Sequence, residues 1–351
     1  MVNDNMKYSF PKVDLHLHLD GSFRASTIWE LAEKQGVKMP ADTLKGYEEW
    51  MEKCSHSGAV NEYLRMFASP LSVLQDKESL ARVTRELIED LEKQGLAYAE
   101  IRFAPQLHTD KGMSQREAIE AVLEGRRQGL EKCPSIKIGI ICCMMCVGAL
   151  SANYDANMET ATITHEYLDK GVVCLDLAGA EGIIPLSNFA PFFNKARELG
   201  TPLICHAGDS QDWHTVKDAI DLGVSRIGHG HHVYENPYLC RYLAEHEIAL
   251  EICPTSNVHC QTRESYELHP AWNLYTIGVP VTINTDNMTM SHVCLEDEYD
   301  HCLNEMGFEY EDLIIMNINS VRHSFMKEED KKELLERLSI ALEECLEEGA
   351  A

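Results

Sequence analysis

The sequence predicts an α/β protein built as one closed (β/α)8 barrel of the TIM type. Eight short runs are apolar along their whole length, and the segments between them mostly show helical periodicity. Strands that are apolar throughout are typical of parallel sheets buried on both faces. The chain has 351 residues and no Pro-, Gly- or Ser-rich linker, which is normal for one barrel with insertions. We therefore expect residues 1–351 to form a single domain.

The order of the elements supports this fold. Eight strand-then-helix units in a chain of this length favour a closed barrel over an open sheet. The clearest helical periodicity lies at residues 78–94, 115–129 and 215–222. The expected strands are residues 13–19, 97–103, 136–144, 172–178, 202–206, 226–229, 249–253 and 279–284.

Two segments are additions to the simple barrel. Residues 36–70 are too long for a plain return after the first strand, and they carry Tyr63, Leu64, Met66 and Phe67 with helix-like spacing. We expect a helical insertion there, which either packs onto the barrel or forms a lid. Residues 327–349 have a charged amphipathic pattern, so we expect extra C-terminal helices with a solvated outer face.

Composition and charge narrow the classes of partner. The formal net charge of −26 disfavours nucleic acid and anionic membranes, since binding either one requires Lys and Arg against phosphates. An uncharged small molecule suits this field better than a phosphorylated one. The sequence contains no run of 18 apolar residues, so it predicts no transmembrane helix. The N-terminus lacks the basic start and apolar core of a signal peptide. We therefore expect a cytoplasmic location.

The sequence has 13 cysteines, which we expect to be reduced thiols in this compartment. Cys143 and Cys146 have CxxC spacing, which is also found in redox and metal motifs. They lie within the apolar run 138–147, however, where free cysteine is a small core residue. We therefore expect them to be buried in the core.

Polar residues gather where the expected strands end. Residues two apart on a strand point to the same side, so His16 and His18 face the barrel interior together. Barrel active sites occupy the mouth at the carboxyl ends of the strands, where these positions converge. The polar strand ends are HLHLDG at 16–21, HAGD at 206–209, HGHH at 229–232 and NTDN at 284–287.

These side chains predict a metal site. Burying several titratable groups together is costly unless they coordinate an ion, and imidazoles with one carboxylate suit zinc. We expect one zinc ion per chain with water completing its shell, held by His16, His18, His206 and Asp286. Such a metal lowers the pKa of its bound water to about 7, and we expect His229 to orient and deprotonate that water while Asp286 also accepts a proton. The fourth strand ends in DLAGAE at 176–181 without the lysine that bridges two metals in some barrel hydrolases, which favours a single metal.

These motifs together resemble those of the adenosine deaminase family of metal-dependent hydrolases. From about Pro11 to Arg322 the chain carries, in the family's order, HLHLDGS, YAEIRFAPQLH, DLAGAE, HAGD, RIGHGHH, EICPTSN and NTDN. The combination is highly specific, whereas any single motif would be weak. The resemblance implies zinc-dependent hydrolytic deamination of a purine nucleoside, in which adenosine or 2'-deoxyadenosine becomes inosine or 2'-deoxyinosine and ammonia leaves after attack at C6.

The resemblance also implies a role for each matching residue. His16, His18, His206 and Asp286 match the zinc ligands, and His229 matches the histidine beside the attacking water. Asp20 matches a carboxylate that accepts hydrogen bonds from the ribose, and His18 also borders the substrate. Gly179 matches a backbone donor to purine N3, and Asn287 the residue that contacts N7. The residues that match apolar neighbours of the base and sugar are Leu64, Phe67 and Met144.

Two positions depart from the usual pattern of the family. The family usually has HAGE, whose Glu donates a proton to purine N1; here Asp209 is one methylene shorter, roughly 1.5 Å. Because a general acid must lie about 2.6–3.2 Å from its target, this change bears on rate and on substrate. Asn287 stands where many relatives have Asp, and an amide donates to N7 without titrating.

Two other interpretations stay open. The chain could deaminate another aminopurine, such as adenine or a 5'-modified adenosine, although Asp20 favours a nucleoside and the motifs hold no Arg/Lys cluster for a phosphate. Asp209 also leaves open a metal-bound but catalytically impaired relative that works as a binding protein. A kinetic panel of purines with metal analysis separates these interpretations.

Overall fold

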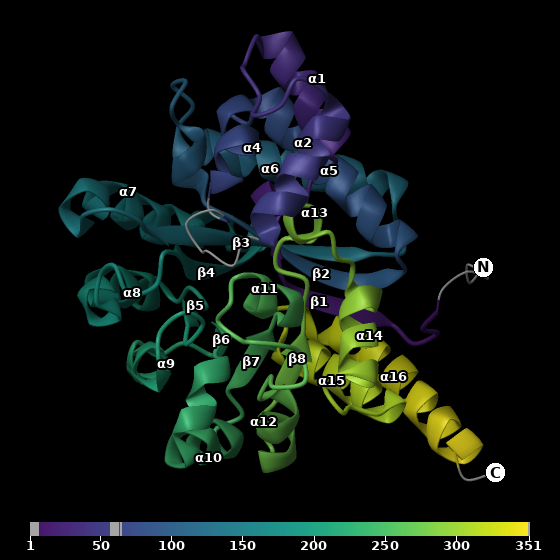
Figure 1. Cartoon of the computed structure of the whole chain (residues 1–351). Helices are drawn as coiled ribbons and strands as arrows, with labels where there is room; N and C mark the ends of the chain where they lie inside the picture. Colours follow the sequence, from purple (N-terminus) through teal and green to yellow (C-terminus); the bar gives the residue numbers. More distant parts are fainter. Residues whose placement is uncertain (1–6, 57–62, 64, 350–351) are drawn as a thin grey trace.

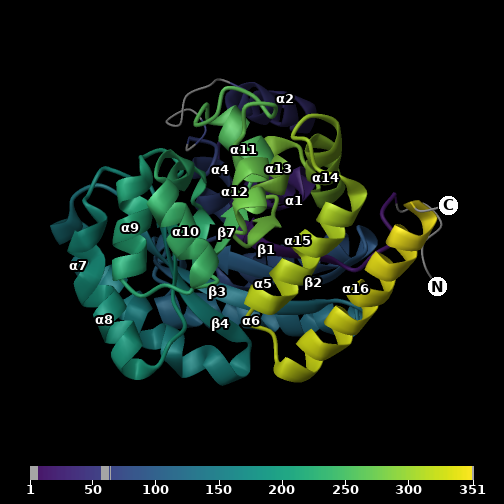
Figure 2. The same ribbon diagram turned by 90° about the horizontal axis from the view of Figure 1, so that it is seen from below.

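The computed structural model describes residues 7–56, 63 and 65–349 of the chain. Its strands form two four-stranded parallel sheets in sequence order, β1-β2-β3-β4 and β5-β6-β7-β8. Leu175 of β4 pairs with Leu203 just before β5, and Leu17 of β1 pairs with Asp286 just after β8. These two bridges close the sheets into a barrel, with the helices outside the strands (Figures 1 and 2). The predicted fold class is confirmed.

All eight predicted strands are present, with ends that agree to within two residues. β5 and β8 begin later than predicted, after Pro202 and Pro280, because proline has no N–H for the ladder and here contributes only its carbonyl to Leu175 and Leu250. The strands are β1 (Lys12–His18), β2 (Leu96–Phe103), β3 (Lys137–Cys146), β4 (Val172–Gly179), β5 (Ile204–Ala207), β6 (Arg226–His229), β7 (Ala249–Ile252) and β8 (Val281–Ile283).

The predicted helices are also present, and side chains cap their starts. Asp76 accepts from the Ser79 amide at the start of α5 (Lys77–Lys93), and Ser114 forms a capping box with Glu117 at the start of α6 (Gln115–Lys132). The other outer helices are α7 (Leu150–Ile163), α8 (Ala190–Leu199), α9 (Trp213–Asp221), α10 (Pro237–Glu245), α11 (Pro254–His259), α12 (Ala271–Ile277), α13 (Met288–Ser291) and α14 (Leu295–Asn304). Short 3-10 helices cover Leu19–Gly21, Pro105–His108, Thr164–Lys170, Leu186–Phe189 and His231–Glu235.

The insertion after the first strand is helical. It follows α1 (Ala25–Gln35) and contains α2 (Leu44–Ser55) and the start of α4 (Ala68–Val73). α2 packs against α13, which directly follows the Asp286 strand end, so the insertion stands beside the carboxyl mouth of the barrel (Figure 1). Leu64 lies outside the described residues.

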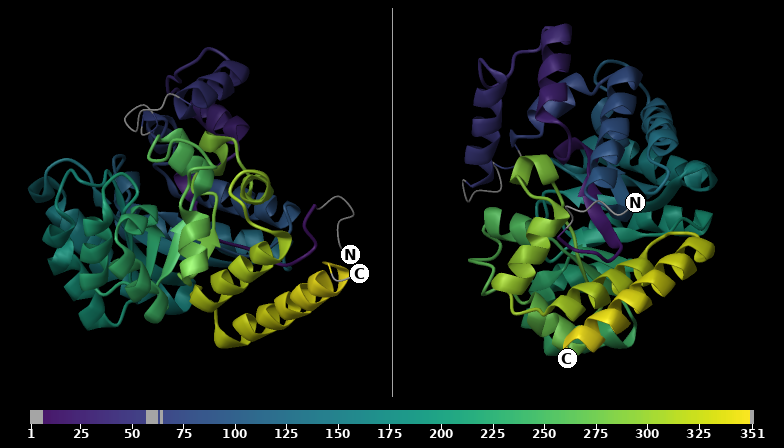
Figure 3. Two further views of the ribbon diagram at one scale, coloured as in Figure 1. Left: turned by 60° about the horizontal axis from the view of Figure 1, so that its bottom comes forward. Right: turned by 90° about the vertical axis from the view of Figure 1, so that its right-hand side faces the viewer.

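The C-terminal helices cover the seam of the barrel. α15 (Tyr310–His323) packs on β8 and β1, and α16 (Glu328–Gly349) lies along α15 as the predicted amphipathic helix (Figure 3). The junction between β1 and β8 is therefore held both by the bridge between Leu17 and Asp286 and by the packing of α15 on the two strands. None of the helices within the described part of the chain has the length and apolar character to span a membrane.

Candidate metal centre and active site

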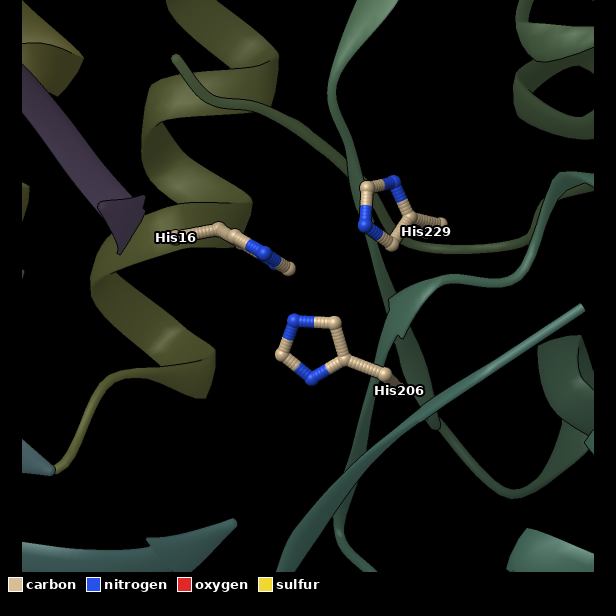
Figure 4. A group of neighbouring side chains, drawn as sticks. All are labelled: His16, His206 and His229. Atoms are coloured by element: carbon tan, nitrogen blue, oxygen red, sulfur yellow. The ribbon is translucent and has the colours of Figure 1, made fainter. Parts of the chain in front are cut away.

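The four predicted ligands meet at the carboxyl mouth of the barrel. The Nε2 atoms of His18 and His206 lie 3.3 Å apart, and Asp286 Oδ1 lies 3.5 Å from His16 Nε2 and 3.4 Å from His18 Nε2. Figure 4 shows the rings of His16, His206 and His229, from three different strands, turned toward one shared space. The structure thus gathers side chains from β1, from β5 and from the chain after β8.

The donor atoms fit a zinc ion. Two ligand atoms at the usual zinc distance in a tetrahedral arrangement lie about 3.3–3.5 Å apart, as these do. His16 Nε2 is buried and has no hydrogen-bond partner among the described residues. An unpaired buried nitrogen is costly unless an ion or ligand meets it, so this atom is best explained as a metal ligand.

Two buried carboxylates set the direction of the ligand rings. Glu251 Oε2 lies 2.8 Å from His16 Nδ1, and Asp176 Oδ2 lies 3.1 Å from His206 Nδ1. Since an ionised carboxylate only accepts, both rings donate from Nδ1 and keep the Nε2 lone pair for a metal. Arg102 links the two carboxylates, with Nη1 2.8 Å from Asp176 and Nη2 2.7 Å from Glu251. The sequence did not lead us to predict the contacts among Arg102, Asp176 and Glu251, although three charged residues inside apolar strands were a signal for them.

The electrostatics favour neutral imidazoles beside an ionised aspartate. Burial lowers the pKa of His16 and of His18, so both rings are neutral donors of a lone pair. Burial opposes a charge on His206 as well, but the Asp176 carboxylate outweighs it and raises the pKa of His206. A metal cation held by Nε2 would take the place of the proton favoured there. Burial would raise the pKa of Asp286, but the neighbouring imidazoles hold it well below its usual range.

The backbone at two strand ends is unusual. His229 and Asp286 have φ values of 60° and 58°, in the left-handed region that residues other than glycine seldom adopt. Asp286 is held there by β1, because its amide donates to His16 O at 2.8 Å and its carbonyl accepts from the His18 amide at 2.7 Å. Such conformations persist where several surrounding contacts hold the residue in place, and they are frequent at functional sites.

His229 is tied to Asp209 through one amide. Asn257 Nδ2 lies 3.1 Å from His229 Nδ1 and 2.8 Å from Asp209 Oδ1. The amide direction is fixed, because Asn257 Oδ1 accepts from His269 Nε2 at 3.1 Å while His269 Nδ1 accepts from the Ala271 amide at 3.1 Å. His229 Nδ1 is therefore an acceptor, and the neutral ring carries its proton on Nε2. In this state His229 can orient a water by donating to it, whereas the sequence led us to expect that it deprotonates the water.

The loop that carries Asp209 is held by Glu181. The Glu181 carboxylate accepts from the amides of Gly208, Asp209 and Ser210 at 2.6, 3.1 and 2.8 Å. Burial would raise the pKa of Asp209, but the neighbouring imidazoles of His229 and His231, the latter through a hydrogen bond, hold it well below its usual range. The acid expected for purine N1 is therefore fixed at its backbone and ionised when no substrate is bound.

A cavity of about 540 Å³ opens beside these groups. No lysine or arginine within the described ranges lines it, whereas Asp20, Glu181, Asp209 and Asp286 do. Asp20 Oδ1 is buried without a hydrogen-bond partner among the described residues, and burial raises the pKa of this carboxyl to about 6. The cavity therefore offers acceptors for hydroxyl groups and, among the residues that the structure describes, no lysine or arginine for a phosphate.

The structure places most of the other expected contacts at this cavity. Gly179, Asn287 and Phe67 line it with His18. Gly179 has a φ of 111°, and a Cβ there would lie 2.6 Å from Cys146 O, so only glycine can present its amide at this point.

Asn287 packs against the backbone of the HLHLDG strand end. A Cβ on Gly21 would lie 1.8 Å from Asn287 Oδ1, so the amide rests directly on the glycine. This Oδ1 is buried and has no hydrogen-bond partner within the described part of the chain. The contact explains why a residue without a side chain precedes Ser22 in this motif.

The prediction that Met144 contacts the base is wrong. Cys143 and Met145 line the cavity, while Met144 is fully buried in the main hydrophobic cluster. Side chains alternate along a strand, so these neighbours occupy the face opposite to Met144. Cys143 and Cys146 are both free and buried, as the core interpretation of the CxxC spacing requires.

Several further residues contact the site without having been predicted. Ser256 Oγ donates to Asp286 Oδ2 at 2.6 Å, and Tyr63 Oη lies 2.8 Å from Ser291 Oγ while its ring lines the cavity. The NTDN motif is thus supported from α11 and from the insertion. Ser256 belongs to the EICPTSN motif and Tyr63 to the helix-like pattern of the insertion, but neither pattern indicated a contact at the site.

Three histidines and an aspartate around an ion-sized space, at the carboxyl mouth of a (β/α)8 barrel, put the chain in the class of metal-dependent barrel hydrolases. The comparison with known families narrows this class. The family model described as Adenosine deaminase matches residues 11–341, and the chain belongs to this family.

Individual relatives agree with this assignment. The chain is 39% identical over 326 residues to a protein of Haemophilus ducreyi named adenosine deaminase, covering 92% of this chain and 94% of the relative. Its fold is similar to that of adenine deaminase from Arthrobacter aurescens, with a TM-score of 0.85, 24% identity and coverage of 95% and 100% of the two chains. It is also similar to Arabidopsis ADAL complexed with IMP, with a TM-score of 0.82, 25% identity and coverage of 95% and 98%.

Proposed function

We propose that this chain is a zinc-dependent enzyme that converts adenosine and 2'-deoxyadenosine to inosine and 2'-deoxyinosine. One zinc ion per chain is held by His16, His18, His206 and Asp286. The observation that carries the proposal is the meeting of these four donor groups at distances of 3.3–3.5 Å beside a cavity that also contains Asp209 and His229. The curated relative named adenosine deaminase, 39% identical over 92% of this chain, supports the choice of substrate.

The residues around the cavity bind and orient the nucleoside. Asp20 Oδ1, buried and otherwise unpaired among the described residues, accepts a hydrogen bond from a ribose hydroxyl. The Gly179 amide donates to purine N3, and the Asn287 side chain donates to N7. Phe67 packs against the apolar faces of the base and sugar.

The reaction replaces the 6-amino group by the oxygen of water. Zinc, when bound, supplies a Lewis acid that lowers the pKa of a coordinated water to about 7. His229 donates from Nε2 to the oxygen that attacks C6 and so fixes its approach. One proton of the water passes through Asp209 to purine N1, and the other passes through Asp286 to the departing amine. The C6–N6 bond breaks, and ammonia leaves as the neutral lactam forms.

The cavity favours a nucleoside over a 5'-nucleotide. A phosphate needs arginine or lysine partners, and none lines the cavity in the part of the chain that the structure describes. Four carboxylates line it, and the formal net charge of −26 adds to the repulsion of an anion. The similar structure of Arabidopsis ADAL is complexed with IMP, so a related fold accommodates a nucleotide.

The remaining features fit this proposal. We propose that the chain works as one unit of residues 1–351, in which the insertion at 36–70 covers the bound nucleoside, because Tyr63 and Phe67 from this segment line the cavity. We also propose a cytoplasmic location, where cysteines buried in the core, such as Cys143 and Cys146, stay reduced.

The test is a kinetic panel with metal analysis on the same sample. Zinc-loaded protein is given adenosine, 2'-deoxyadenosine, 5'-modified adenosines, AMP and adenine, and the loss of the aminopurine absorbance band is followed. We expect kcat/KM for the two nucleosides to exceed that for AMP and adenine by about 100-fold or more, with one zinc per chain. A preference for adenine would assign the chain to another aminopurine, and tight nucleoside binding without turnover would make it a binding protein.

A further inference from the structure

One oxygen of Asp209 is surrounded by side-chain donors. Oδ1 lies 2.8 Å from Asn257 Nδ2, 3.1 Å from Thr262 Oγ1 and 3.2 Å from His231 Nε2. No described residue makes a hydrogen bond to Oδ2, and the Asp209 side chain is 26% exposed where it lines the cavity. The two oxygens of one carboxyl group therefore have different surroundings, one enclosed by protein and one facing the space for substrate.

The direction of the His231 bond is fixed from behind. Arg263 Nε lies 2.7 Å from His231 Nδ1 and can only donate, so Nδ1 is an acceptor and the proton of the ring is on Nε2, toward Asp209. His231 is fully buried, and burial lowers its pKa to about 3, which keeps it neutral. Arg263, His231 and Asp209 thus form a directed chain of hydrogen bonds.

The second nitrogen donor is fixed in the same way. Asn257 Nδ2 faces Asp209 because His269 donates to the other end of this amide. The Thr262 hydroxyl has one proton and a second acceptor, Asn257 O, at 3.1 Å, so its bond to Asp209 is shared. Oδ1 therefore faces two N–H donors, from Asn257 and His231, and one shared O–H donor, and Thr262 Oγ1 is a second, more distant neighbour of His231 Nε2 at 3.4 Å.

The loop itself cannot move the acid toward the substrate. Glu181 accepts from the consecutive amides of Gly208, Asp209, Ser210 and Gln211, which pins the backbone of the loop. Asp209 is one methylene shorter than the Glu usual in the family, so the position of its carboxyl group must be set through the side chain. His231, Asn257 and Thr262 are the groups that set it.

We propose that His231 is a positioning residue for proton delivery, which with Asn257 and Thr262 holds Oδ1 of Asp209 as a permanent acceptor and so places the transferable proton on Oδ2. An oxygen that already accepts two N–H groups has no lone pair directed at a further proton, whereas Oδ2 faces the cavity. Oδ2 takes one proton of the water that attacks C6 and passes it to purine N1, so Asp209 ends the cycle ionised, as it began. This inference deepens the proposed function and rests on it.

The variants compare a lost donor with a retained one. His231→Phe keeps a buried ring without a donor, and His231→Gln keeps an N–H that can reach Asp209. We expect kcat for adenosine to fall about 10- to 100-fold in His231→Phe, the effect of one hydrogen bond to a charged group, with KM changed little. His231→Gln is expected to recover most of kcat. His232→Gln is the matched control, because His232 bonds to Glu235 and not to Asp209.

A second readout separates positioning from general damage. 1-Deazaadenosine has a C–H in place of N1 and cannot accept a proton from Oδ2, so its Kd, measured by calorimetry, is expected to be the same in wild type, His231→Phe and His231→Gln. Zinc content is expected to stay at one per chain. If His231→Phe does not fold, Arg263→Met tests the same chain by releasing the His231 ring, with a smaller loss of kcat.

The outcomes distinguish the inference from the function it rests on. Wild-type protein that leaves adenosine unchanged would overturn the proposed function. Active wild-type protein together with His231→Phe at wild-type kcat would overturn the positioning role alone. Equal losses of zinc, of 1-deazaadenosine affinity and of kcat would show that His231 only supports the fold.

Discussion

Asp176→Asn tests how the metal site is held together. Asp176 is fully buried; its Oδ2 lies 3.1 Å from His206 Nδ1 and 2.8 Å from Arg102 Nη1, and its Oδ1 accepts from the Leu177 amide at 2.7 Å. An asparagine has one oxygen where the aspartate has two. Whichever way the amide turns, its NH2 group faces either the Arg102 guanidinium or the Leu177 amide, and His206 donates to a neutral oxygen instead of a carboxylate.

The size of the effect follows from these contacts. A charge-assisted hydrogen bond is about twice as strong as a neutral one, and loss of the carboxylate behind a ligating histidine typically weakens metal binding about 10- to 100-fold. We therefore expect the Kd for zinc to rise by this factor, which is about 1.4–2.8 kcal/mol. The donor left without an acceptor is expected to lower the free energy of unfolding of the metal-free protein by about 1–3 kcal/mol.

The assay measures metal affinity and stability separately. Metal-free protein is titrated with zinc against a chromogenic chelator well below the unfolding temperature, and unfolding by urea is followed on the same preparation. Glu298→Gln is the matched control: Glu298 is also fully buried and accepts from the Thr255 amide, and burial raises its pKa well above its usual range, so glutamine resembles its neutral form. We expect this control to bind zinc as the wild type does.

Two results would refute the reasoning. A zinc Kd for Asp176→Asn within about twofold of wild type would show that His206 does not depend on this carboxylate for its Nε2 lone pair. An equal loss in Glu298→Gln would show that zinc affinity follows general stability and not the contact to His206.

Three further expectations follow from the same geometry. His206→Ala should lose stoichiometric zinc and deaminase activity together, measured by metal analysis and absorbance; full activity at wild-type zinc content would contradict the ligand role. Asp209→Glu should keep or raise kcat, because the longer acid is the usual one of the family, and a collapse on every purine would show that the site is built around the shorter acid. Burial lowers the pKa of His108 to about 4, so between about pH 6.5 and pH 4 only the unfolded chain binds a proton at this histidine. The contribution of His108 to the free energy of unfolding of metal-free protein should therefore fall by about 3 kcal/mol as the pH falls through this range. Urea titrations of His108→Leu should show a shallower pH dependence, and an unchanged slope would exclude His108 as the source.

The fold and the meeting of the four candidate ligands could be predicted because they depend on regular geometry. Parallel strands of a closed barrel end at the same mouth, so polar residues at the ends of β1, β5, β6 and β8 had to converge there. The alternation along β1 put His16 and His18 on one side, as found. Nothing beyond strand periodicity and strand order was needed for this step.

The supporting residues could not be predicted in the same way. Asp176, Glu251 and Arg102 appear in the sequence as three charges in three separate strands, and their pairing exists only in the closed barrel. Met144 shows the opposite failure, since the family resemblance pointed to the right strand but to the wrong face. A shift of one residue moves a side chain to the other side of a strand, so a contact transferred by likeness needs the local register to be checked.

The left-handed backbone at His229 and Asp286 explains how these two side chains reach the axis of the barrel. β6 and β8 have only four and three residues, and a strand that continued beyond them would carry the next side chains along the barrel wall. The turn at φ near 60° directs both side chains to the axis instead, at a cost of about 1–3 kcal/mol for each such residue. Pairing with β1 offsets this cost at Asp286, whose backbone makes two hydrogen bonds there, and the Gly230 amide bonds to Ala207 O directly after His229. The backbone hydrogen bonds of neighbouring strands therefore position the carboxylate and the imidazole.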